Sequence, residues 1–161
     1  MLALRFAAVL ALVFWVGGLA AVGTLAAPAA FDVLASRAAD GRTAAGAVVG
    51  ETLRRFHHVA YICAAVLVLS LAIRGVLGPR PRPFGIRVAL LAAMVGATAY
   101  SGLVLSPAIE QAQRTLGVSP TTLPAGDPRR VEFGRLHGRS VYVQLVPLLG
   151  GIALLFWEMK D

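Results

Sequence analysis

Four long apolar runs, separated by charged segments, constrain this chain more than any other feature. They are Phe6–Ala27, His58–Leu77, Ile86–Leu105 and Val141–Trp157. A helix needs about 20 apolar residues to cross a hydrocarbon core of roughly 30 Å. The fourth run is shorter, but it ends on an aromatic pair typical of a membrane interface. The length of the first run favours a retained span over a cleaved signal peptide. The sequence therefore predicts an all-α integral membrane protein, a four-helix transmembrane bundle.

The composition agrees with a membrane location. Hydrophobic residues make up 58% of the 161 residues and charged residues only 14%, whereas about 25% of a typical soluble domain is charged. The net charge of +7 comes from arginines that flank the apolar runs, where they set orientation and contact lipid phosphates. We therefore expect the lipid bilayer and other membrane subunits as partners, and no nucleic acid. The bias to Arg and Ala, with Lys160 the single lysine, favours a bacterial inner membrane.

The two halves of the chain carry matching residues at nearly equal spacings. The first half has Gly23, Pro28 and His57, and the second half has Gly102, Pro107 and His137. The separation of glycine and proline is the same in both halves, and the separation of proline and histidine differs by a single position. The spacing predicts one domain, 1–161, of two pseudo-symmetric helical hairpins, 1–78 and 84–161. Three alternating prolines in the connector at 79–83 exclude helix there.

Local signals extend the helices beyond the apolar runs. Thr43–Leu77 contains no proline, which predicts one continuous helix that projects past the bilayer. Pro28 and Pro107 fall where helix-favouring residues continue, so each is expected inside a longer helix. Asp127 followed by Pro128 is typical of an N-cap and a first helical position. Pro147 predicts a kink in the fourth helix.

The distribution of arginines predicts the orientation of the chain in the membrane. Arg80, Arg82 and Arg87 lie in or just after the short connector, a segment without an acidic residue. Short loops rich in Lys and Arg stay in the cytoplasm. We therefore expect both termini and the connector in the cytoplasm.

The paired histidines are the main candidate for a binding site. His57 and His137 each enter a span near the membrane boundary, and two imidazoles from different helices are suited to haem b or to a transition metal. Both rings are then expected to face a shared interior pocket. Four nearby cations would pair with haem propionates or another anion; they are Arg54, Arg55, Arg135 and Arg139.

The alternative is that these residues only stabilise the protein at the membrane interface. Histidine there often hydrogen-bonds a neighbouring helix, and arginine contacts headgroups. His58 points about 100° away from His57 on a helix and is the weaker candidate.

Few polar residues lie within the spans. The main ones are Thr98, Tyr100, Ser101 and Gln144, with Tyr61 near the boundary. Gln144 either orients a ligand or hydrogen-bonds another helix. The spans carry no acidic residue near their middle, which argues against a proton relay or a carboxylate-driven transporter.

Several motifs resemble a known group. They are Trp15-Val16-Gly17-Gly18, Ala27-Pro28-Ala29-Ala30-Phe31 and Phe133-Gly134-Arg135-Leu136-His137-Gly138-Arg139-Ser140. Together with Tyr100 and Ser106-Pro107, they resemble the domain-of-unknown-function family typified by transmembrane protein 205. This resemblance implies a four-helix membrane protein without an assigned activity.

The aromatic-Gly-Gly first span is more distantly similar to copper-resistance D-type proteins and to small membrane protoporphyrinogen oxidases, some of which bind haem through histidine. The first span here contains no histidine, which leaves haem or metal binding to His57 and His137. Three functions follow as hypotheses: a haem- or metal-binding module, a ligand-free accessory subunit of a larger membrane complex, and an enzyme of the haem-pathway oxidase type.

Overall fold

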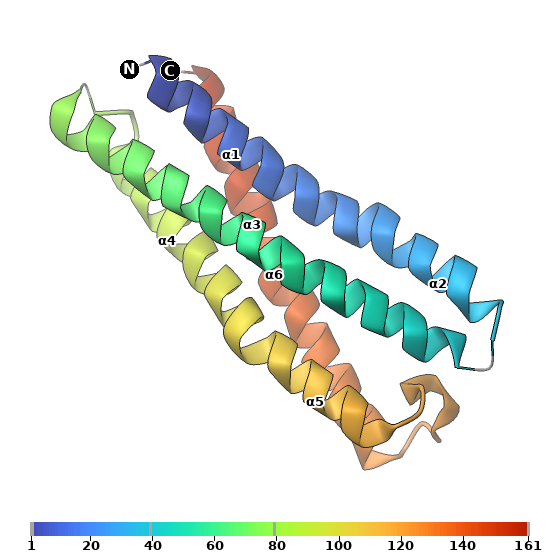
Figure 1. The fold of residues 1–161 in the computed structure, drawn as a ribbon. Helices are drawn as coiled ribbons and strands as arrows, with labels where there is room; N and C mark the ends of the chain where they lie inside the picture. The colour runs from blue at the N-terminus through green and yellow to red at the C-terminus, as the bar shows by residue number, and fades with distance from the viewer. Residues whose placement is uncertain (1, 39, 79, 161) are drawn as a thin grey trace.

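Four long helices run side by side in a computed structural model that describes residues 2–38, 40–78 and 80–160. The elements in chain order are α1 (Leu2–Ala21), the π-helical turn η1 (Val22–Ala26), α2 (Ala27–Ala35), α3 (Gly41–Leu77), α4 (Phe84–Tyr100), the π-helical turn η2 (Ser101–Leu105), α5 (Ser106–Leu116), the short 3-10 turn η3 (Pro120–Thr122) and α6 (Pro128–Lys160). The start of α1, the end of α6 and the connector between α3 and α4 lie at one end of the bundle. The two longer loops, between α2 and α3 and between α5 and α6, lie at the other end (Figure 1).

The helices form a ring in which each packs against two neighbours. α1 packs on α3 and α6, and α4 packs on the same two helices from the other side. Beyond the π turns, α2 stays on α3 and α5 stays on α6. All four long helical units are long and apolar enough to cross a membrane. The predicted all-α, four-helix membrane bundle is confirmed.

Most of the predicted helix boundaries are also confirmed. α3 is one continuous helix of 37 residues, which corresponds to about 55 Å and exceeds a hydrocarbon core of about 30 Å. The Asp127 carboxylate accepts a hydrogen bond from the Arg129 backbone N–H at 2.9 Å, as an N-cap should. The bond from the Arg129 side chain lowers the pKa of this carboxyl below its ordinary value. α6 continues through Pro147, and the kink predicted there remains a prediction.

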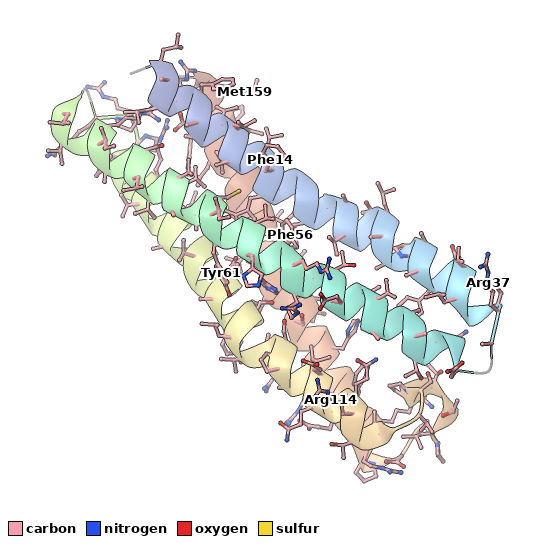
Figure 2. All side chains as sticks on the ribbon, viewed as in Figure 1. Phe14, Arg37, Phe56, Tyr61, Arg114 and Met159 are labelled. Atoms are coloured by element: carbon pink, nitrogen blue, oxygen red, sulfur yellow. The ribbon has the colours of Figure 1, made fainter. Side chains whose placement is uncertain are left out.

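The positions of charged residues mark the membrane band on α3 and α6. The stretch of α3 from Arg55 to Arg74 and the stretch of α6 from Arg139 to Glu158 are equally long. Each stretch corresponds to about 28 Å of helix, close to the thickness of the hydrocarbon core. In Figure 2, Arg37 and Arg114 lie toward the loop end and Met159 at the opposite end.

A π-helical turn precedes the proline in each half of the chain. The offset along the chain from η1 to η2 equals the offset from Pro28 to Pro107. Proline cannot donate a backbone hydrogen bond, so the helix must rearrange its bonding before it. Here the rearrangement is a wider turn, and the hydroxyls of Thr24 and Ser106 donate to nearby backbone carbonyls at 2.8 and 2.9 Å. Both helices continue through their prolines, as predicted.

One carboxylate fastens three helix ends at the connector end of the bundle. Glu158 of α6 is 6% exposed and binds Arg74 of α3 at 2.8 Å and Arg87 of α4 at 2.6 Å. Arg87 also donates to the backbone carbonyls of Arg82 and Trp157. Arg5 of α1 donates from Nε to the backbone carbonyl of Glu158 at 2.9 Å. A buried, hydrogen-bonded ion pair of this kind fixes the positions of its partners.

We expect Glu158→Gln to destabilise the protein by about 3–5 kcal/mol, because it removes the carboxylate from a buried pair of guanidinium groups. The measurement is the free energy of unfolding in detergent micelles. The control is Glu132→Gln, since Glu132 pairs with Arg135 on the exposed surface of α6 and such pairs contribute about 0–1 kcal/mol. Equal stability of the two variants would show that the buried pair is not needed.

Candidate functional site

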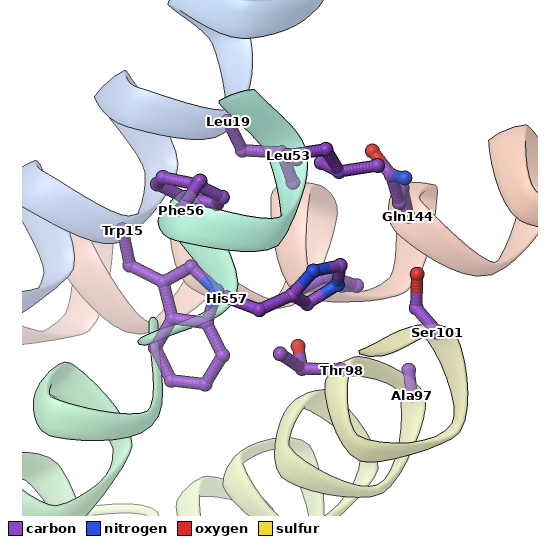
Figure 3. Close-up of a pocket in the computed structure, with 10 residues that line it drawn as sticks. Trp15, Leu19, Leu53, Phe56, His57, Ala97, Thr98, Ser101 and Gln144 are labelled. Atoms are coloured by element: carbon purple, nitrogen blue, oxygen red, sulfur yellow. The ribbon is translucent and has the colours of Figure 1, made fainter. Parts of the chain in front are cut away.

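His57 is buried, with 6% of its surface exposed, where all four long helices meet. A small cavity of about 10 Å³ adjoins the ring. It is lined by Trp15 and Leu19 of α1, Leu53, Phe56 and His57 of α3, Ala97 and Thr98 of α4, Ser101 of η2, and Gln144 and Pro147 of α6. Figure 3 shows the imidazole extending into the space between Thr98, Ser101 and Gln144. No pair of neighbouring helices could form this pocket alone.

Three buried hydroxyl groups in this region have no hydrogen-bond partner among the described residues. They belong to Tyr61, Thr98 and Ser101. A buried hydroxyl without a partner costs about 1–3 kcal/mol, and nearly all such groups in proteins are paired. A cavity of about 10 Å³ is close to the smallest that holds one water molecule. This region therefore carries hydroxyl groups whose hydrogen-bonding capacity the described residues leave unused.

Gly102 allows α3 to approach the π turn closely. A Cβ atom at this position would contact the Tyr61 hydroxyl and lie 3.1 Å from Cδ2 of His57. At Gly23, the corresponding position of the first half, a Cβ atom would meet nothing within 4 Å. Only one of the two matching turns is therefore pressed against a histidine.

His137 does not share the pocket with His57. Its side chain is exposed and stacks on Phe133 of its own helix, with ring centroids 6.2 Å apart. The expectation that both imidazoles face the interior is wrong for His137. The physical reason is that α2 packs on α3 rather than on α6, and the buried position in this part of α6 belongs to Ser140. His58 is also exposed, as its angle from His57 on the helix requires.

The four candidate arginines lie outside the residues that line the cavity. Arg54 and Arg55 both bind Glu51 at 2.7 Å, on the exposed side of α3. Arg135 binds Glu132 in the same way on α6, and Arg139 is exposed. Three of the four cations thus have a carboxylate partner on their own helix.

The described residues form no group of three or more His, Cys, Asp or Glu able to hold a metal ion. Cavities that take drug-sized ligands measure about 300–1,000 Å³, far more than the space beside His57. As the helices are packed here, that space is smaller than a haem requires.

Sequence reasoning does not reveal the site role of Thr98 and Ser101. Both are recognisable as polar residues within a span, but nothing in the sequence links them to His57. One signal is present: the two hydroxyls lie a single helical turn apart and shortly before Pro107, where a proline-induced bulge is to be expected.

The fold and site define a class of protein: a four-helix membrane protein with a small, mostly apolar cavity inside its bundle that a few polar side chains also line. The chain belongs to a family known as a domain of unknown function (DUF4149), whose model matches residues 10–117. The match includes Trp15, His57, Thr98 and Ser101, and ends before α6. No curated protein and no solved structure matches the chain. The resemblance is confirmed at this coarser level, and the link to transmembrane protein 205 and copper-resistance D-type proteins remains a prediction.

We expect Gly102→Ala to lower the free energy of unfolding by about 1–3 kcal/mol, because the added methyl group overpacks against Tyr61 and His57. Thermal unfolding in detergent measures the effect. Gly23→Ala is the matched control, since it sits in the equivalent π turn with open space around it. The assignment of Gly102 to a close contact would be wrong if both variants unfolded at the wild-type temperature.

Proposed function

We propose that this protein is a membrane-embedded binding module whose pocket takes the polar, uncharged end of a lipid-soluble molecule. The observation that carries the proposal is a set of three buried hydroxyls, beside a buried histidine, for which the described part of the chain supplies no partner. These groups come from α3, α4 and η2, and Gln144 adds an amide from α6.

The chemistry of the lining selects the ligand. Hydroxyl groups donate and accept, as do neutral imidazole and amide groups, and the residues that line the cavity include neither a carboxylate nor an arginine or lysine. Such a set suits a carbonyl or hydroxyl oxygen, and a space the size of one water admits one such oxygen. Trp15 and Phe56 supply aromatic surface beside it. A quinone has this chemistry: one of its carbonyl oxygens would enter the cavity, while its apolar ring, which the cavity cannot hold any more than it can hold a haem, would lie outside it.

The depth of the pocket supports a ligand that enters from the lipid. His57 follows Arg55 by two residues, at the start of the apolar stretch of α3. The polar end of an amphiphilic molecule resides at this level of a bilayer. Because charged residues such as Arg55 lie just before His57 on α3, the pocket is expected at the membrane boundary rather than in the middle of the membrane.

The haem or transition metal predicted from the two histidines is the competing ligand, and a ligand-free accessory subunit or a haem-pathway oxidase are the competing functions. The burial of His57 supports haem or metal binding, but the exposure of His137 leaves such a site with a single histidine ligand. An absorption spectrum and elemental analysis of the purified protein test this alternative directly. A Soret band or stoichiometric metal would replace the quinone in the proposal.

We expect a short-chain ubiquinone to quench the tryptophan fluorescence of a Trp157→Phe variant, in which Trp15 of the pocket lining is the remaining tryptophan, in a saturable manner. His57→Ala should weaken binding about tenfold or more, because it removes a hydrogen bond and leaves neighbouring polar groups unpaired. The control, His58→Ala, changes the adjacent exposed histidine and should stay within about twofold of the wild type. Linear quenching, or equal affinity of the two variants, contradicts the proposal.

We further propose that the protein resides in a bacterial inner membrane with both ends and the connector in the cytoplasm, as its arginines predict. A cysteine placed at the connector by Arg82→Cys should then resist a membrane-impermeant maleimide added to intact cells. Arg129→Cys, in the exposed segment that begins α6, should react. The native Cys63 is buried and adds little background. The reverse labelling pattern would invert the orientation.

A further inference from the structure

The connector end of the bundle gathers positive charge from four helices and the connector. The cations described there are Arg5, Arg74, Arg80, Arg82, Arg87 and Lys160. The acidic residue described at this end is Glu158. We propose that this end is a binding site for the headgroups of anionic phospholipids. The proposal is independent of the His57 pocket, which lies near the other membrane boundary.

The floor of this site is rigid. Ser70, Arg74, Arg87 and Glu158 form the polar part of the lining of a cavity of about 20 Å³ where α1, α3, α4 and α6 meet. The ion pairs at 2.8 and 2.6 Å hold the two guanidinium groups in place. Both guanidinium groups are buried and paired with Glu158, so they leave one fixed net positive charge at this end of the bundle and do not contact a phosphate directly.

The rim of the site carries exposed cations held at the height of a lipid headgroup. The Arg80 guanidinium lies 6.0 Å above the ring of Phe84, and the Lys160 ammonium lies 4.5 Å above the ring of Phe156. Arg82 of the connector is also exposed. Aromatic rings with cations above them are typical of the membrane interface, where long basic side chains extend to the phosphates.

A phospholipid is favoured over a soluble anion because apolar side chains are exposed next to the cations. Leu2 is 82% exposed, Val76 82%, Leu77 74% and Met159 75%. These residues lie at the ends of α1, α3 and α6, where they offer acyl chains a contact surface. Guanidinium groups bind phosphate through paired hydrogen bonds. A headgroup and its chains are therefore both accommodated.

The test is a titration of the purified full chain in detergent with phosphatidylglycerol or phosphatidylcholine, read by native mass spectrometry. Phosphatidylglycerol should bind more tightly. The triple variant Arg80→Gln/Arg82→Gln/Lys160→Gln should weaken its binding about 100-fold, since each cation near an anionic lipid contributes about fivefold. All three side chains are exposed, so the variant keeps the packing of the bundle.

The matched control is Arg54→Gln/Arg55→Gln/Arg135→Gln, which removes three cations from the opposite end. It should retain phosphatidylglycerol binding within about fivefold of the wild type. Equal binding of phosphatidylcholine, or an equal loss in the control, overturns the proposal. A further arm adds inorganic phosphate as competitor. Complete displacement of the lipid by inorganic phosphate would mean that the site serves a soluble anion, and that result also overturns the proposal.

Discussion

The absence of water from a bilayer core governs this structure. Every backbone N–H and C=O inside the hydrocarbon must find a partner within the protein. Proline removes one donor, and this chain places Pro28 and Pro107 within two of its four helical units. The π-helical turns before them, with the hydroxyls of Thr24 and Ser106 on neighbouring carbonyls, meet that requirement without ending the helix. The local widening of η2 also presents Ser101 and Gly102 to α3, so the same rearrangement that satisfies the backbone shapes the pocket.

The two halves share their helical pattern but differ in their polar chemistry. Two copies of one hairpin would each carry a π-helical turn at the same position before the proline, as the two halves of this chain do. Tyr61 lies half-buried against Gly102, whereas Tyr142, the tyrosine that follows the second histidine, is 74% exposed. A polar side chain is buried only where neighbouring helices cover it on every side. At His57 the turn η2 packs on α3, whereas α2 does not cover the part of α6 that carries His137. Packing rather than sequence spacing decides which histidine is buried.

Much of the fold can be predicted because its signals are local. Apolar run length predicts the spans, the alternating prolines predict the connector, and the sequence Asp127-Pro128 predicts a helix start that the structure confirms. The candidate site can be predicted only in part. His57 is recognisable from the sequence, but the exposure of His137 depends on which helix covers it, and that is a property of the assembled bundle.

The buried ion pairs show the same limit. Arg74, Arg87 and Glu158 are widely separated along the chain, and each is recognisable in the sequence only as a charged residue near the end of an apolar run. Only the packing of three helix ends brings them within hydrogen-bond distance. Interactions of this kind depend on helix rotation and depth, which hydrophobic periodicity does not fix.

The origin of the pocket residues has an evolutionary consequence. Trp15, His57, Thr98 and Gln144 come from four different helices, two from each hairpin. Two identical hairpins related by symmetry would have the same lining residues at both interfaces between them. When the two hairpins are parts of one chain, each can change separately, so polar residues can accumulate at one interface and not at the other. If the two halves arose by the predicted duplication, their copies have diverged in polar chemistry while keeping the same helical pattern.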